Sequence, residues 1–144
     1  MRTKLLFLII LVASAVSVLS QNVSTAETGP IRSSGAYAEI LLRRTELQAD
    51  IEAFTADYTE ENPKVVDARF ELAVLTKDLD RIYLVRPSET SKLTQALGKL
   101  IVRRAAIETE LTRLLRTYNK DHPDVKRTKR RAEIFAAAIK EILG

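Results

Sequence analysis

The sequence of 144 residues contains no cysteine and no tryptophan, and it has a single histidine. Without thiols the chain forms neither a disulfide nor a lipid-modified N-terminal cysteine, and a thiolate or imidazole metal site lacks its ligands. No serine or threonine stands in a recognisable arrangement with a base and an orienting acid. The composition therefore predicts a non-enzymatic protein without a metal or other cofactor, stabilised by packing.

Long apolar runs are also rare, and the one at residues 5–19 follows Arg2 and Lys4. A basic start, a short apolar run and small residues are typical of a secretory signal, whereas a membrane-spanning helix needs about 20 apolar residues. We expect residues 1–20 to be a cleaved signal peptide and the protein to be periplasmic or secreted. An uncleaved anchor in the inner membrane is the alternative. Residues 21–35, rich in Ser, Thr and Gly, are expected to form a flexible lead-in.

Two of the four prolines stand in similar octapeptides, YTEENPKV at residues 58–65 and YNKDHPDV at residues 118–125. Both contain Tyr, Pro and Val at the same internal spacing, and they lie 60 residues apart. The correspondence continues outward without a gap as far as Ile82, which matches Ile142. A fixed offset of this kind indicates an internal repeat of one supersecondary unit.

Apolar residues in each copy recur at alternating steps of three and four, which is the pattern of a helix packed along its length against a partner. Strand alternation is absent, so we predict an all-α fold. In each octapeptide a polar stretch interrupts the apolar seam, and Pro stands where a helix can begin. Each octapeptide is therefore predicted to be the tip of an antiparallel helical hairpin. The predicted tip residues are Tyr58, Asn62, Pro63, Val65, Tyr118, His122, Pro123 and Val125.

The predicted organisation is a tandem of two hairpins, at residues 36–84 and 92–144, joined by a connection at residues 85–91. They would form a four-helix bundle or an elongated coiled coil. Ser88 is a candidate cap for the helix that follows the connection. At the tips we expect His122 to cap or solvate the helix start, and the tyrosine phenols to hydrogen-bond the backbone rather than stack on sugars.

The segment LLRTYNKDHPDVKRTKRRAEI, residues 114–134, resembles the coiled-coil hairpin of bacterial polysaccharide chain-length determinants. In that family a Tyr, a few polar residues and His-Pro-x-Val separate two long periplasmic helices. The second copy matches this pattern, whereas the first copy has Asn62 in place of the histidine. The sequence contains neither the second membrane span nor the nucleotide-binding loop found in members of the family. The resemblance implies a helical hairpin in the exported space that assembles with other helices; control of glycan length does not follow.

The two copies carry opposite charge. Residues 36–83 contain 6 basic and 11 acidic residues, a net charge of −5, and residues 96–143 contain 12 and 6, a net charge of +6. Opposite charges beside an apolar seam steer helices into the correct pairing. We expect the first hairpin to pack on the second, within a chain or between chains, so self-association or a helical partner protein is predicted.

Arg44 and Arg104 occupy seam positions where the spacing predicts apolar side chains, and a charge there requires a partner. Counting back from the turn places Arg44 near Asp78. The equivalent neighbourhood of Arg104 offers no acid, so we expect its carboxylate on the other hairpin. We interpret these charges as fixing the register of the helices rather than binding a ligand.

A basic run follows the second tip. We interpret it as a solvated helix face, and as a candidate binding face for an anionic glycan or a membrane surface; an exported protein is not expected to meet nucleic acid. The residues of this face are Lys126, Arg127, Lys129, Arg130 and Arg131.

The sequence as a whole predicts a helical spacer, adaptor or oligomerisation module at the bacterial cell envelope, with a link to polysaccharide export implied by the resemblance. The alternative is a periplasmic binding or chaperone-like module that holds an acidic polymer or an unfolded client on the basic second hairpin. A spacer buries its seams within itself, whereas a chaperone exposes a concave apolar face.

Overall fold

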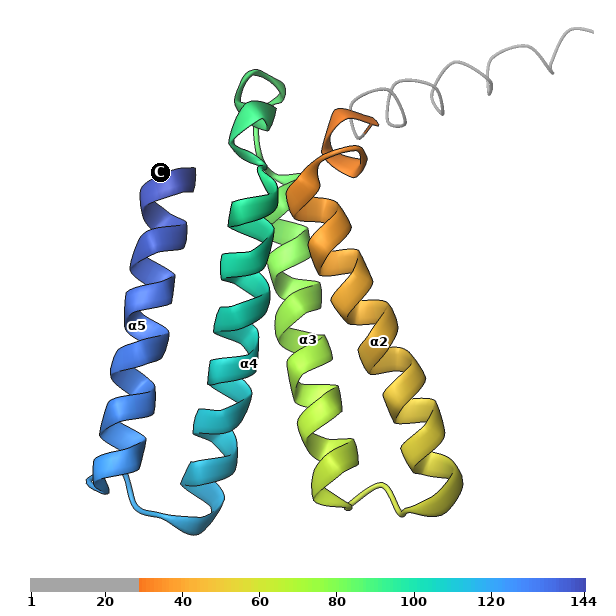
Figure 1. Cartoon of the computed structure of the whole chain (residues 1–144), viewed down its shortest axis with the longest axis vertical. Helices are drawn as coiled ribbons and strands as arrows, with labels where there is room; N and C mark the ends of the chain where they lie inside the picture. Colours follow the sequence, from red (N-terminus) through yellow and green to blue (C-terminus); the bar gives the residue numbers. More distant parts are fainter. Residues whose placement is uncertain (1–28) are drawn as a thin grey trace, which may run out of the picture.

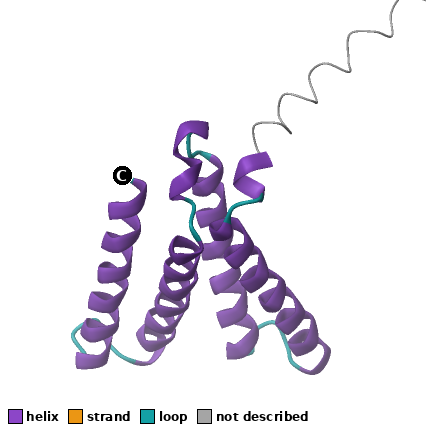
Figure 2. Ribbon diagram, turned by 45° about the horizontal axis from the view of Figure 1, so that its top comes forward, coloured by secondary structure: helices purple, strands orange, loops and turns teal. Residues whose placement is uncertain are grey.

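The computed structural model describes residues 29–144, so the predicted signal peptide and most of the predicted lead-in lie outside the described residues. Four long helices follow one another, and a 3-10 helix stands between the second and the third. These elements are α2 (Gly35–Asp57), α3 (Pro63–Tyr83), η1 (Pro87–Lys92), α4 (Gln95–Thr117) and α5 (Pro123–Leu143). No strand occurs in the described part of the chain (Figure 2), and the all-α prediction is confirmed.

The turns between α2 and α3 and between α4 and α5 have nearly the same local structure. Asn62 and His122 each precede a proline at the first helical position, and each side chain accepts a backbone N–H of the first turn. The proline has no N–H to leave unpaired, and the cap satisfies one of the donors that a helix start leaves without a partner. The polar octapeptides therefore end one helix and begin the next.

The connection between α3 and α4 differs from the prediction. Ser88, expected to cap the following helix, lies inside η1, and α4 begins only at Gln95. Thr94 caps it instead, with its side chain accepting the N–H of Leu97 at 3.3 Å. Pro87 explains the shift, because its fixed φ begins a separate short helix before the chain turns into α4.

The four long helices run up and down side by side, and both interhelical turns lie at the same end (Figure 1). α2 packs against α3, and α4 packs against α5. α4 also contacts α2 and α3, whereas α5 packs mainly on α4. α2, α3 and α4 therefore pack against one another, and α2 and α5 lie at the two sides of the array in Figure 1.

The main core lies where α2, α3 and α4 meet. Most of its residues belong to the halves of these helices that are remote from the two turns. Its buried members are Ile31, Ala36, Ile40, Leu47, Ala68, Leu75, Leu79, Ile82, Leu93, Leu97, Ile101 and Ala105. Ile31 belongs to the predicted flexible lead-in, so packing begins before the predicted boundary at residue 36. The burial of Ile31 could not be predicted from the sequence, because a single isoleucine in a polar segment shows no helical periodicity.

α2 and α4 approach each other closely at the end of the array opposite the turns. The N–H of Ala36 donates to the carbonyl of Leu93 at 3.1 Å. A Cβ added at Gly98 would lie 2.9 Å from the Ala36 Cα and 2.7 Å from the Glu39 Cβ. Glycine at this position therefore allows the two helices to touch backbone to backbone.

Candidate functional site

The predicted tip residues lie at the two turns, where they form similar surfaces. Val65 and Val125 are buried, which closes the apolar seam beneath each turn. Tyr58 and Tyr118 are 44% and 42% exposed, so each tip presents one aromatic ring to solvent. The tips are therefore the places where the otherwise polar turn regions offer apolar surface.

The expectation that the tyrosine phenols bind the backbone is wrong, because neither hydroxyl makes a hydrogen bond within residues 29–144. The Lys64 Nζ instead lies 5.5 Å from the centroid of the Tyr58 ring, and the Tyr118 ring stacks on His122 with centroids 4.1 Å apart. Both tyrosines directly follow a helix in extended backbone, and each ring lies beside the first residues of the next helix. His122 caps α5 as expected, with Nδ1 accepting the N–H of Asp124 at 3.2 Å.

The carboxylate that Arg104 was expected to find on the other hairpin is Asp78 of α3. The Arg104 Nη2 lies 2.6 Å from Oδ1 and 2.5 Å from Oδ2 of Asp78. Asp78 is 4% exposed and Arg104 is 9% exposed, so the pair is buried. The Nε of Arg104 has no hydrogen-bond partner among residues 29–144 and lies 3.6 Å from the nearest Glu108 oxygen. This buried pair links the two helix pairs of the chain.

Asp78 therefore does not serve Arg44, which the sequence placed beside it. Arg44 forms no ion pair with any described residue, and its buried Nε has no hydrogen-bond partner. Its neighbour Arg43 is the paired arginine of α2, with Nε 2.7 Å from Oε1 of the buried Glu71. The hydrogen bond to Glu71 holds the pKa of Arg43 above its usual value. Seam counting failed here because it treats a hairpin as isolated, whereas α4 covers the face of α3 that carries Asp78.

The contacts of α3 with α4 could have been predicted from a second pattern in the α3 sequence. Besides its apolar seam, α3 has a second stripe at steps of four, three and four: Asp67, Glu71, Val74 and Asp78. Two of these acids reach α4, because Asp67 pairs with Arg116 and Asp78 with Arg104. A second stripe on one helix indicates a second packing partner.

The candidate basic face lies exposed on α5, and most of its cations pair with nearby acids. Arg127, the most exposed of those in ion pairs at 76%, pairs with Asp124. The other pairs are Lys126 with Asp121 at 3.3 Å, Arg130 with Glu133 at 3.3 Å and Arg131 with Glu110 at 3.9 Å. Lys129 has no ion pair within the described residues. Exposed pairs contribute only about 0–1 kcal/mol, so these side chains can exchange their partners for another anion.

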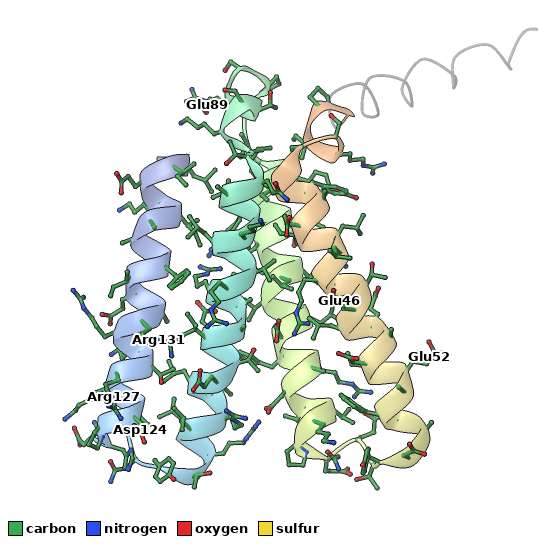
Figure 3. All side chains as sticks on the ribbon, in the orientation of Figure 1. Glu46, Glu52, Glu89, Asp124, Arg127 and Arg131 are labelled. Carbon is green, nitrogen blue, oxygen red and sulfur yellow. The ribbon has the colours of Figure 1, made fainter. Side chains whose placement is uncertain are left out.

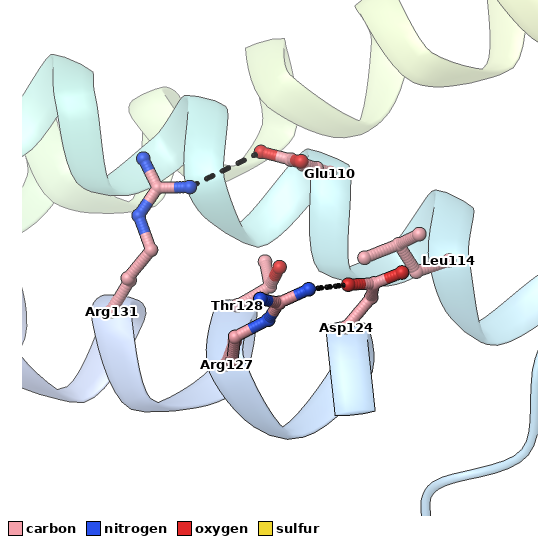
Figure 4. A pocket seen from close by; sticks show the side chains of 6 residues that line it. All are labelled: Glu110, Leu114, Asp124, Arg127, Thr128 and Arg131. Carbon is pink, nitrogen blue, oxygen red and sulfur yellow. Dashed lines mark hydrogen bonds and ion pairs between the residues drawn. The ribbon is translucent and has the colours of Figure 1, made fainter. Parts of the chain in front are cut away.

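A shallow hollow of about 340 Å³ lies between α4 and α5 beside this face (Figure 4). Its lining residues are Glu110, Leu114, Asp124, Arg127, Thr128 and Arg131. The Arg127 guanidinium donates to Asp124 and holds the pKa of that carboxyl below its usual range. The hollow contains two acids and two arginines that pair with each other, so it has no excess of positive charge for an anion.

Within residues 29–144 no three His, Asp or Glu side chains are grouped closely enough to hold a metal ion. None of the described helices combines the length and the apolar character that crossing a membrane requires. Comparisons with family models, with curated proteins and with solved structures found no match for the chain.

Proposed function

We propose that the protein is an exported, non-enzymatic helical spacer and oligomerisation module of the bacterial cell envelope, built from two equivalent antiparallel hairpins. The helix bounds support the repeat, because α4 and α5 begin and end 60 residues after α2 and α3. The nearly equal backbone angles at Asn62 and His122 support it as well. The hairpins lie side by side as an open array in which α4 is central, rather than as a closed bundle.

Burial of the apolar seams inside the protein is the observation that carries this proposal. Ile40, Leu75 and Leu97 are fully buried between helices. The large apolar side chains that stay exposed are distributed over four helices and the connection: Leu41, Leu42, Val66, Leu84, Leu115 and Ile134. A protein that holds unfolded clients needs a contiguous concave apolar face. The described surface favours a spacer over a chaperone.

The dimensions suit a spacer. Helices of 21 and 23 residues extend about 32 to 35 Å at 1.5 Å per residue. Both tips lie at one end of the array, and the chain enters α2 at the other end (Figure 1). The array would therefore hold its tips about 30 Å from the point where the chain begins to pack.

A second candidate function is binding of an anionic glycan or membrane surface by the basic face of α5. The exposure of Arg127 and the weakness of its ion pair favour it, because such a side chain can turn to a new anion at little cost. A link to polysaccharide export is supported by the residues of the second tip alone, namely Tyr118, His122, Pro123 and Val125.

Cell fractionation tests the spacer proposal. The 144-residue chain is produced in a bacterium, and its amounts in the cytoplasmic, periplasmic and membrane fractions are measured. Mass spectrometry determines its N-terminus. Export with removal of residues 1–20, and no protection of a denatured client from aggregation, are the expected results. An intact chain in the cytoplasm, or strong protection of the client, would contradict the proposal. Salt-sensitive binding to an acidic polysaccharide, lost in Arg127→Glu, would establish the second function.

A further inference from the structure

α4 docks on the first helix pair through a stripe that is separate from its seam. The stripe consists of Gly98, Ile101, Ala105 and Thr109, all buried. Gly98 faces α2, and Ile101 and Ala105 belong to the core that α4 shares with α2 and α3. Small side chains at three of the four positions let α4 approach its neighbours closely.

The same stripe recurs on α2, where nothing within the described residues covers it. The residues 60 positions earlier are Ala38, Leu41, Thr45 and Ala49. All four are exposed, and Leu41 is 43% exposed. The outer edge of α2 therefore repeats, in an open form, the surface by which α4 docks within the chain.

At the opposite edge of the array, α5 carries the residues that correspond to the α3 side of this junction. The second α3 stripe, which reaches α4 through Asp67 and Asp78, has its counterpart on α5. Asp67, Glu71, Val74 and Asp78 correspond there to Arg127, Arg131, Ile134 and Ala138. Ile134 preserves the apolar position of Val74 and is 55% exposed. Two of the three acids are replaced by arginines and the third by Ala138, so this edge has changed the sign of its charge while keeping its apolar centre.

We propose that the two edges bind each other in different copies of the chain: α2 of one copy docks on the α4–α5 pair of the next, as α4 docks on the α2–α3 pair within a copy. This inference rests on the two-hairpin repeat of the proposed function and names a second copy as the partner. α2 contains 2 basic and 5 acidic residues, a charge of −3, and α5 contains 6 and 3, a charge of +3. Contacts of α2 with α2, or α5 with α5, would juxtapose like charges, so the complementary contact is head to tail.

The register of the junction within the chain predicts the contacts between copies. Asp78 faces Arg104 and Asp67 faces Arg116, so the numbers of facing residues add up to 182 or 183. The same rule places Arg131 opposite Glu52 of the next copy and Ile134 opposite Ala49. Glu52 points away from the array at its outer edge (Figure 3) and has no ion pair within the described residues. In this register Arg131 would pair with the Glu52 carboxylate, and Ile134 would pack on the apolar surface at Ala49.

Two substitutions make the contact between copies weaker than the one within the chain. Ala38 stands where α4 has Gly98, and a Cβ at Gly98 would lie 2.7 Å from the Glu39 Cβ, so the copies pack more openly at this end. Ala138 stands where α3 has Asp78, so Arg44 gains no carboxylate. The association is therefore reversible and depends on protein concentration.

Sedimentation equilibrium of the 144-residue chain tests the inference. Arg131→Glu and Glu52→Arg each place like charges opposite each other, and each is expected to weaken self-association by roughly tenfold or more. An equimolar mixture of the two variants restores association, because each then meets the opposite charge. Lys77→Glu makes the same charge change as Arg131→Glu on an exposed site of the inner helix α3 and leaves the association constant unchanged.

The inference is overturned if the unaltered protein is monomeric at every concentration, if both single variants associate as it does, or if the mixture fails to recover. Circular dichroism melting confirms that each variant is folded. These outcomes are separate from the test of the proposed function. A monomeric chain that is exported rejects only the contact between copies, whereas a cytoplasmic chain that associates rejects only the envelope role.

Discussion

The buried pair of Asp78 and Arg104 allows a quantitative test of how the two helix pairs are joined. Asp78→Leu leaves the Arg104 guanidinium, 9% exposed, without its carboxylate. Removing one partner of a buried pair typically costs about 3–5 kcal/mol. Glu108, 3.6 Å from Arg104 Nε, offsets part of the loss, so we expect a cost near the lower end of this range.

Arg104→Met exposes the reverse situation, a buried carboxylate without its guanidinium. Arg81, whose Nη1 lies 3.4 Å from Oδ1 of Asp78, is 55% exposed at its side chain and can supply only a weak replacement. We expect a loss of about 3 kcal/mol for this variant as well. The double variant Asp78→Leu/Arg104→Met replaces both charges by apolar groups, and we expect it to be within about 1 kcal/mol of the unaltered protein or more stable.

Urea unfolding followed by circular dichroism measures all four proteins. If each single variant loses about 3 kcal/mol and the double variant changes by about 0 kcal/mol, the coupling between the two side chains is about 6 kcal/mol. Single variants that each lose less than about 1 kcal/mol would refute the conclusion that this buried pair stabilises the junction between the helix pairs. Because the pair is buried, its contribution should also change little with salt, unlike the exposed pair of Asp67 and Arg116.

Three further predictions concern the close approach, the caps and the connection. Gly98→Ala should lower the free energy of unfolding in urea by about 1–3 kcal/mol despite the better helix propensity of alanine, because the added Cβ meets the α2 backbone. In the control Gly29→Ala the added Cβ has nothing within 4 Å, so stability should change by less than about 0.5 kcal/mol. Equal effects of the two substitutions would contradict the packing argument. His122→Ala and Asn62→Ala should each cost about 1 kcal/mol, whereas His122→Asn should be nearly neutral; a neutral His122→Ala would show that the cap is unimportant. The Arg86 and Lys92 hydrogen bonds hold the pKa of Glu89 at about 2, so its stabilisation is present above the usual glutamate pKa of about 4.3 and disappears as pH falls towards 2. NMR titration should show this pKa rising in Arg86→Ala, and an unchanged titration would exclude the hydrogen bond as its cause.

Local chemistry made the helices and their turns predictable. Proline after Asn62 or His122 ends one apolar seam and begins another, so the positions of these turns depend on a few neighbouring residues. The buried residues of the seam were predictable for the same reason, because the steps of three and four repeat over several turns of helix.

Contacts between helix pairs were harder to predict because they depend on tertiary packing. Asp78 was assigned to Arg44 within its own hairpin, whereas α4 covers that face of α3 and brings Arg104 to it. Thr94 replaced Ser88 as a cap because the chain first forms η1. The arginine partner was nevertheless correctly sought on the other hairpin, since a buried charge without a carboxylate would be unstable.

The position of the main core has a mechanical consequence. Most of its side chains lie at the end opposite the turns (Figure 1). The helix pairs are therefore held together mainly at that end. Near the turns, the surface ion pair of Asp67 and Arg116 also links the two helix pairs. An exposed ion pair contributes much less free energy than the buried core at the opposite end. If this ion pair opens, we expect the two hairpin tips to move apart while the core stays packed, so that the distance between Tyr58 and Tyr118 varies.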